Sequence, residues 1–274
     1  MKKTLAVIMT VHNRKDSTVE CLRRFYRCKG IEDYDIEIYL MDDGSTDGTS
    51  EAVAGEFPGV ILLQGDGNLF WNRGMYNCWK EAGKKHHDFY LWLNDDTMLF
   101  EEALEVLFSD YAAGEELSII SGACCSDETR SQVTYGGRVG DNLVAPDGTP
   151  KPIEFMNGNL VLIPDRVFQT LGLNDPYYRH SLGDFDYGCR ARKAGVKVLL
   201  SSAYVGVCER HDGCLKYGDP QYSLKERFRF LYSPRYDAVA QFHLNWNRRS
   251  PVVAVGAFIQ QNLRALFPPS NKEN

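Results

Sequence analysis

Residues 5–14 read LAVIMTVHNR, an apolar and β-branched run that stops abruptly at three polar residues. Two later segments have the same form, since residues 36–43 (IEIYLMDD) and 89–96 (FYLWLNDD) each end in two aspartates. Apolar runs of this length, separated by stretches with helical periodicity, are typical of strands buried on both faces of a parallel sheet. The sequence therefore predicts an α/β fold, a mostly parallel sheet flanked by helices.

The same alternation continues to about residue 200 and sets the expected element boundaries. Strands are expected at residues 5–11, 36–41, 60–63, 89–93, 117–121, 159–163 and 196–200. Helices are expected at residues 16–28, 49–57, 74–85, 101–111, 164–171 and 184–194. We expect Asp16 to cap the first helix. Residues 124–154 are polar and rich in Gly and Pro, which predicts a hairpin or a flexible substrate loop.

The last part of the chain has a different composition. Residues 216–249 carry seven Lys and Arg against three Asp and Glu, and residues 252–267 have apolar side chains at helical spacing. We expect a domain at residues 1–215, with halves at 1–121 and 122–215, followed by a basic, aromatic helical C-terminal extension at 216–274. Two hypotheses stay open for the extension. Its helices pack on the sheet domain with solvated arginines, or its basic face receives an anionic acceptor at a membrane surface.

Composition argues against several classes of protein. The 274 residues include 37 acidic and 31 basic ones, and the net charge of −6 argues against a dedicated nucleic-acid binder. No apolar run approaches the roughly 20 residues that span a bilayer. The apolar run after Lys3 is too short for a signal peptide, so we expect a cytoplasmic protein whose cysteines are free.

The polar clusters at the strand ends predict a ligand site, because such sheets bind ligands beyond the carboxyl ends of their strands. Asp95 and Asp96 would repel each other and need a compensating cation. Their oxygens suit Mg²⁺ or Mn²⁺, whose shells are completed by substrate phosphates. Asp42 and Asp43 could accept hydrogen bonds from a nucleotide base or ribose. For both pairs the alternative is a set of turn residues that cap the next helix.

Two further segments carry candidate side chains. Arg73, in the glycine-rich loop 65–74, could meet a phosphate or stack on a ring, although the loop could equally be structural. Asp184 opens a later helix, either as a functional carboxylate kept ionised by the helix dipole or as an N-cap. No G-x-G-x-x-G follows the first strand and no G-x-x-x-x-G-K-[ST] occurs, which argues against a Rossmann-type NAD site and a P-loop NTPase.

Taken together, these segments resemble the family-2 glycosyltransferases of GT-A fold. The resemblance covers about residues 4–212 and rests on the order and strand-end placement of its motifs. They are the opening strand, residues 41–47 (MDDGSTD), residues 67–68 (GN), residues 93–96 (LNDD), similar to the DXD region, residues 157–159 (NGN), and residues 183–191 (GDFDYGCRA), similar to the acidic "ED" segment. The sequence departs from the usual pattern in four places. His12 replaces a tyrosine, Asn94 the first DXD carboxylate, and Gly183 the glutamate of "ED". Residues 71–74 replace the commoner small-residue pattern.

The resemblance implies a role for each matching residue. Asp95 would hold the ribose, and Asp184 would be the catalytic base. Asp96 and His211 would bind a divalent metal, Mn²⁺ or Mg²⁺, that bridges the diphosphate. The other residues expected in the nucleotide-sugar site are Thr10, His12, Asn13, Arg14, Asp43, Asn68 and Arg73. Among these, Thr10, His12 and Asp43 would contact the base.

The resemblance also implies a reaction, in which a hexosyl or deoxyhexosyl residue moves from a nucleotide-diphosphate sugar to a hydroxyl of a glycan or lipid-linked acceptor, as in polysaccharide biosynthesis. One carboxylate base and no covalent nucleophile imply direct displacement with inversion. Two alternatives stay open. One is a catalytically silent nucleotide- or sugar-binding module of the same fold. The other is a phosphate-handling enzyme, which should have a phosphate-cradling Gly/Lys loop near the first strand.

Overall fold

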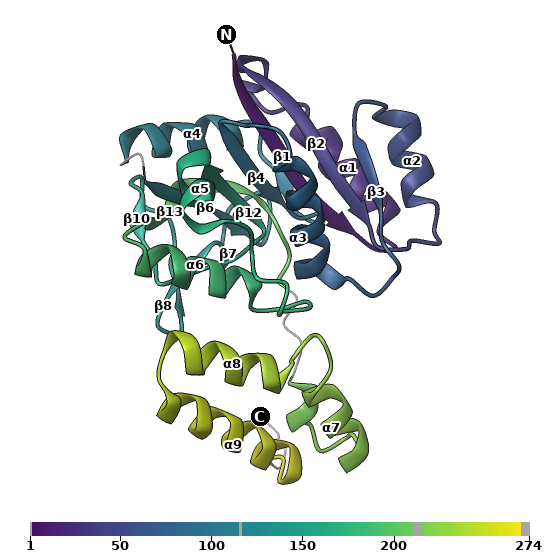
Figure 1. Cartoon of the computed structure of the whole chain (residues 1–274), viewed down its shortest axis with the longest axis vertical. Coiled ribbons are helices and arrows are strands. Elements are labelled where there is room, and N and C mark those ends of the chain that lie inside the picture. The colour runs from purple at the N-terminus through teal and green to yellow at the C-terminus, as the bar shows by residue number, and fades with distance from the viewer. Residues whose placement is uncertain (1, 115–116, 211–214, 270–274) are drawn as a thin grey trace.

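The computed structural model describes residues 2–114, 117–210 and 215–269, and one large sheet forms its centre (Figure 1). The strand order is β10-β13-β6-β12-β4-β1-β2-β3. Four neighbouring strands are parallel and match the predicted apolar runs: β1 (Lys3–Val11), β2 (Tyr34–Asp42), β3 (Ile61–Gln64) and β4 (Phe89–Leu93). Their carboxyl ends therefore lie at one edge, as the site hypothesis requires.

The other half of the sheet is mixed. Strand β12 (Leu160–Pro164) runs antiparallel between β4 and β6 (Ser118–Cys125), whereas β6 and β13 (Lys197–Val207) are parallel. Shorter strands at the margins are β5 (Met98–Leu99), β7 (Val133–Tyr135) and β10 (Lys151–Pro152). A second small sheet contains β8 (Gly137–Val139), β9 (Asn142–Leu143) and β11 (Phe155–Met156). The predicted hairpin is the β8–β9 pair.

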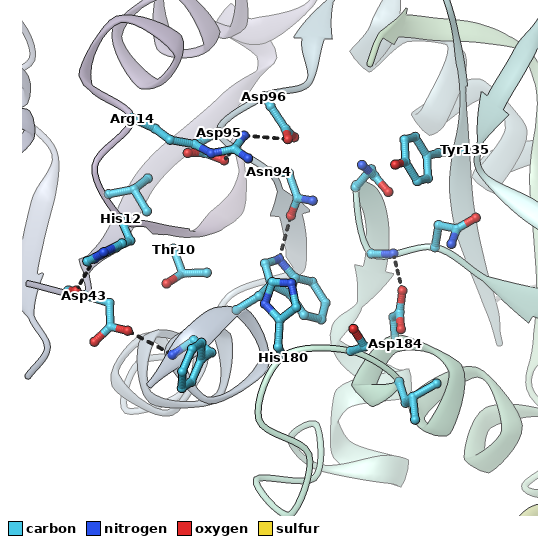
Figure 2. A pocket seen from close by; sticks show the side chains of 18 of the residues that line it. Thr10, His12, Arg14, Asp43, Asn94, Asp95, Asp96, Tyr135, His180 and Asp184 are labelled. Carbon is cyan, nitrogen blue, oxygen red and sulfur yellow. Dashed lines mark hydrogen bonds and ion pairs between the residues drawn. The ribbon is translucent and has the colours of Figure 1, made fainter. Parts of the chain in front are cut away.

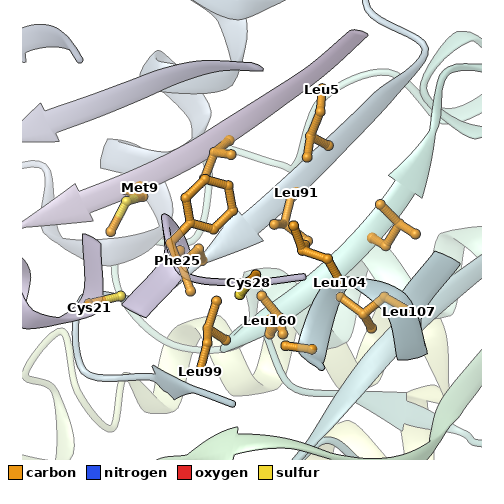
Figure 3. Close-up of a cluster of buried hydrophobic side chains, with 14 of the residues drawn as sticks. Leu5, Met9, Cys21, Phe25, Cys28, Leu91, Leu99, Leu104, Leu107 and Leu160 are labelled. Carbon is orange, nitrogen blue, oxygen red and sulfur yellow. The ribbon is translucent and has the colours of Figure 1, made fainter. Parts of the chain in front are cut away.

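Helices cover both faces of the sheet, which confirms the predicted α/β architecture. One face carries α1 (Lys15–Phe25), α2 (Thr49–Glu56) and α4 (Ala103–Ala113), and the other carries α3 (Phe70–Ala82), α5 (Asp165–Leu171) and α6 (Gly183–Lys193). Successive side chains of a strand point to opposite faces. Leu5 and Met9 accordingly join the core cluster under α1 and α4 (Figure 3), while Ala6 and Ile8 face α3. All seven cysteines in the described residues are free and buried.

Two predicted helix starts are wrong. The N-cap of α1 is Arg14, which makes no side-chain capping bond, and Asp16 lies in the first turn, where its charge still favours the helix dipole. Helix α3 begins at Phe70 instead of residue 74, because the carboxylate of Asp43 accepts a hydrogen bond from the Phe70 N–H at 2.9 Å. That contact satisfies a helix-end donor from a residue 27 positions earlier.

The expected helical extension is present as α7 (Leu224–Leu231), α8 (Ala238–Arg248) and α9 (Pro251–Leu266), which lie beside one another below the sheet layers (Figure 1). Part of its basic character is internal. The Arg227 guanidinium donates to the Ala265 carbonyl at 2.7 Å, and that of Arg248 donates to Asp186 at 2.7 Å. None of the helices in the described ranges has the length and apolar character required to cross a bilayer.

Candidate functional site

A cavity of about 540 Å³ opens where β1, β2 and β4 end. Figure 2 shows side chains from these strand ends on one side and Asp184 with Tyr135 on the other. The cavity brings together seven of the residues that the sequence singles out, namely Thr10, His12, Arg14, Asp43, Asp95, Asp96 and Asp184. The residues at the strand ends therefore line one cavity together with Asp184.

The two aspartates at the carboxyl end of β2 serve mainly to hold loops. The buried Asp43 carboxylate accepts the N–H groups of Gly67 and Phe70, each at 2.9 Å. Asp42 accepts the Ser45 N–H at 2.8 Å and the Ser50 hydroxyl. These bonds fix the glycine-rich loop against the cavity. Asp42 matches the turn alternative, while Asp43 both holds the loop and lines the cavity.

The polar residues after β1 divide between the cavity and the neighbouring loop. The His12 ring lies on the cavity wall, where its Nδ1 is 2.7 Å from the Asp43 carbonyl oxygen. Asn13 adopts a left-handed backbone conformation (φ 51°), and its side-chain oxygen accepts the Thr46 N–H at 2.7 Å. Asn13 therefore ties β1 to the loop after β2 and does not line the cavity.

Two other candidates also point away from the cavity. Arg73, in the first turn of α3, donates from Nε to the Pro176 carbonyl at 3.0 Å. Asn68 is exposed, and its backbone N–H donates to the Asp66 carboxylate at 2.9 Å. The Asn68 side-chain amide also donates to the Asp66 carbonyl at 3.4 Å. Both residues therefore organise the loops that surround the cavity and lie outside its lining.

Asp95 and Asp96 share one cation among the described residues. The Arg14 guanidinium lies 2.7 Å from Asp96 Oδ2 and 3.8 Å from Asp95 Oδ1. Asp95 Oδ2 is buried and has no hydrogen-bond partner in the described part of the chain. Burial, followed by the neighbouring Asp96 charge, raises the pKa of Asp95 to about 7. The buried Asp95 carboxyl therefore holds a proton more readily than an exposed aspartate does.

This donor set fits a divalent ion that substrate helps to hold. Within the described residues, no three His, Cys, Asp or Glu side chains form a group that could hold a metal alone. Mg²⁺ and related hard cations commonly bind through one or two carboxylates while phosphates and waters complete the shell. Asp96, which lines the cavity beside Asp95, provides such a half-site. His211, the other expected ligand, lies outside the described residues.

Asp184 and Asp186, two positions apart on α6, have different environments. Asp184 faces the cavity, and its carboxylate accepts the N–H groups of Gly158 and Phe185, each at 2.9 Å. Burial raises the pKa of Asp184 to about 6, against the lowering effect of these hydrogen bonds. Asp186 is fully buried and pairs with Arg190 at 3.1 Å and with Arg248 at 2.7 Å. Only Asp184 is placed to meet a ligand.

Several cavity residues were not among the predicted site residues. Trp71 donates from its indole N–H to the Asn94 side-chain oxygen at 2.7 Å, so this bond forms part of the wall between the aspartate pair and the α6 side of the cavity. A Cβ at position 158 would come within 2.4 Å of the Trp71 ring, and glycine there allows the close approach. Asn94 belongs to the LNDD motif, and Trp71 lies in the glycine-rich loop 65–74.

His180 also lines the cavity, and no local motif marks it. Desolvation by the surrounding cavity walls lowers the pKa of its imidazole, which favours the neutral ring. The extension braces the segment on which His180 lies. Arg179 pairs with Asp237 at 3.0 Å, and the Ser181 hydroxyl donates to the Arg235 carbonyl at 2.9 Å. Helix α8 thus supports the loop that leads into Asp184.

These features define a class: a sheet of GT-A type whose strand-end carboxylates and a helix-borne aspartate face one cavity. The sequence profile described as "Glycosyl transferase family 2" matches residues 6–161, more than half of the chain, and the chain belongs to that family. It is therefore a glycosyltransferase. No curated protein sequence matches this chain closely enough to be a relative.

Solved structures with the same fold include other glycosyltransferases. The mannosyltransferase PcManGT from Pyrobaculum calidifontis, in complex with GDP-Man and Mn²⁺, is 13% identical with a TM-score of 0.55, over 97% of this chain and 74% of that one. S. aureus TarS 1–349 is 13% identical with a TM-score of 0.59, over 95% and 81%. GalNAc-T7 with UDP, GalNAc and Mn²⁺ is 14% identical with a TM-score of 0.59, over 97% and 58%. At these identities the likeness concerns the fold.

Proposed function

We propose that this protein transfers a hexosyl or deoxyhexosyl residue from a nucleotide-diphosphate sugar to a hydroxyl of a glycan or lipid-linked acceptor, with inversion. The observation that carries the proposal is the position of Asp184. Its half-buried carboxylate faces the same cavity as Asp95 and Asp96. Hydrogen bonds from two backbone N–H groups hold the carboxylate in a fixed orientation. A single oriented carboxylate is what acceptor activation requires.

The donor would lie along the strand ends. We propose that Thr10, His12 and Asp43 contact the base and that the Asp95 carboxylate, which lines the cavity, accepts a hydrogen bond from a ribose hydroxyl. Arg14, already beside Asp96, would face the diphosphate.

Asp96 and His211 would hold the divalent cation, Mn²⁺ or Mg²⁺. When bound, the cation would neutralise charge on the nucleoside-diphosphate leaving group. Asn13, Asn68 and Arg73 would shape the surrounding loops, because their side chains bond to neighbouring backbone.

Asp184 would remove the proton from the acceptor hydroxyl as that oxygen attacks the anomeric carbon. With a pKa of about 6 it is mostly ionised at neutral pH, yet basic enough to accept a proton. No second carboxylate is required, since the nucleoside diphosphate leaves without protein acid. Displacement in one step inverts the anomeric configuration.

The acceptor side rests on the second half of the chain. We propose that residues 1–121 bind the nucleotide, that 122–215 bind the acceptor, and that 216–274 form a separate extension. The small core around Tyr217, Leu231, Ala238 and Ala265 supports the last boundary. We also propose that the protein works at the cytoplasmic face of a membrane, in polysaccharide biosynthesis. An anionic acceptor or membrane surface would contact the exposed Arg229 and Arg249.

The membrane proposal has a simple test. Wild type should pellet with anionic vesicles at low salt and less at high salt, because exposed charges are screened over about 8 Å at physiological ionic strength. The variant with Arg229→Ser and Arg249→Ser should pellet less. Arg227 and Arg248 are left intact because they bond internally. Equal pelleting of both proteins, or none by wild type, would contradict this part of the proposal.

A panel of nucleotide sugars tests the reaction itself. With Mn²⁺ present, one nucleotide sugar of the panel should bind and raise the Tm of the protein. The same nucleotide sugar should release its nucleoside diphosphate when its sugar is transferred to a glycan acceptor or to water. Proton NMR of the first product should show the inverted anomer. Binding without any release across donors and acceptors would favour the catalytically silent module.

A further inference from the structure

Helix α9 has two separate apolar faces. The inner face, which includes the buried Ala254 and Ala265 and the partly buried Phe258, packs against α7 and α8. The outer stripe is defined by five exposed side chains that no described element covers: Val252 (81% exposed), Val255 (45%), Ile259 (52%), Leu263 (50%) and Leu266 (42%). A contiguous exposed apolar stripe marks an interaction surface.

The spacing of the outer stripe is symmetric. Its members follow one another at intervals of three, four, four and three residues, so they lie on one side of a helix with 3.6 residues per turn. Val255 and Leu263 stand four residues either side of Ile259, and Val252 and Leu266 stand seven either side. The stripe therefore has the same spacing of apolar side chains in both directions along the helix.

We propose that the outer stripe of α9 pairs with the same stripe of a second copy of this chain, antiparallel about a two-fold axis at Ile259. In that register Val252 meets Leu266 of the second copy, Val255 meets Leu263, and Ile259 meets itself. Isologous contacts of this kind are the commonest way in which identical chains associate.

Charge supports a second copy over other occupants. Residues 251–266 contain one charged residue, Arg264, whose side chain lies against Gly218 on the inner side of the helix. A helix that binds a membrane surface usually carries Lys and Arg on its polar face, and a charged partner would find nothing to pair with here. An uncharged stripe is complemented by another uncharged stripe.

The available area is sufficient for a small specific interface. The five stripe residues are continued by Phe267, which is 70% exposed. At roughly 90 Å² for each half-exposed side chain, the two copies would bury on the order of 1,100 Å² together, just above the roughly 1,000 Å² that a specific interface needs. Gly256 has no atom within 4 Å of an added Cβ and leaves room for a close helix approach.

Sedimentation velocity of the full chain over a wide concentration range tests this proposal. Wild type should reach twice the 31.1-kDa chain mass. Ile259→Glu and Ile259→Lys should each remain monomeric, because like charges meet at the axis. An equimolar mixture of the two variants should recover the dimer. As the control, Leu224→Glu alters a 47%-exposed side chain of α7 away from the stripe and should dimerise like wild type.

Any of three outcomes would overturn the pairing about Ile259: a monomeric wild type, dimeric Ile259 variants, or a mixture of the two variants that stays monomeric. Wild type that is monomeric and pellets with uncharged phosphatidylcholine vesicles would assign the stripe to lipid instead. Circular dichroism melting of each variant checks that a loss of mass reflects dissociation and not unfolding.

Discussion

Replacing Asp184 by asparagine keeps the shape of the side chain and removes its charge. The free energy of unfolding of the variant therefore measures how much the buried charge destabilises the wild-type protein. Burial holds the pKa of Asp184 at about 6 in the folded protein. An aspartate in an unfolded chain has a pKa of about 3.9. At pH values between these two pKa values, Asp184 is ionised in the unfolded chain but still protonated in the folded protein. The free energy of unfolding therefore falls as pH rises through this range, and it stays low above the folded pKa.

The magnitude follows from the two pKa values and the two hydrogen bonds. A difference of about two pKa units corresponds to at most about 3 kcal/mol of lost stability above neutral pH. Asparagine escapes this loss, but its single oxygen can keep only one of the bonds from the Gly158 and Phe185 N–H groups, at a cost of about 1 kcal/mol. We expect Asp184→Asn to be more stable than wild type by roughly 1–2 kcal/mol above about pH 7, and no more stable near pH 4.

Urea unfolding at a series of pH values measures this difference. The matched control is Asp186→Asn, two residues further along the same helix. Because Asp186 is fully buried against Arg190 and Arg248, its neutralisation should cost about 3 kcal/mol at neutral pH. The reasoning is refuted if Asp184→Asn is less stable than wild type throughout the pH range, or if the two variants behave alike.

Three further predictions concern the reaction. The kcat/KM of wild type should rise with pH and level off above a midpoint near the Asp184 pKa of about 6, because only the ionised carboxylate accepts a proton, and a flat profile would argue for another base. Asp96→Ala should abolish the effect of Mn²⁺ on the Kd of UDP, GDP or dTDP, whereas equal metal dependence in variant and wild type would contradict its assignment as a metal ligand. Trp71→Phe removes the hydrogen bond to Asn94 and should lower kcat/KM for the donor sugar about five- to tenfold while the Kd of the free nucleotide hardly changes. An equal loss in both quantities would place Trp71 with the nucleotide instead.

The sequence alone was sufficient to predict the strands whose pattern depends only on neighbouring residues. The apolar runs predicted β1 and β4 to within a few residues, since a strand buried on both faces needs little else. The position of β12, antiparallel between β4 and β6, has no local signal because strand order depends on pairing across the whole sheet. The start of α3 depends on Asp43, which lies far from it in sequence.

The site shows the same division. Strand ends predicted which segments meet at the cavity, but not the direction of each side chain. Asn13 and Arg73 point to neighbouring loops, which residue type alone does not reveal. His180 went unnoticed because it reaches the cavity through a loop braced by Asp237 and Arg235 of the extension, contacts that join residues more than fifty positions apart.

The most direct test of the account compares donor turnover with nucleotide affinity in wild type and Asp184→Asn. Once a donor sugar and acceptor are found, the release of nucleoside diphosphate gives kcat, and titration of the same nucleoside diphosphate gives Kd. We expect a kcat lower by about 10²–10⁴-fold in the variant, the range for loss of a general base, with an unchanged Kd. A variant that turns over at the wild-type rate would show that Asp184 is not the base.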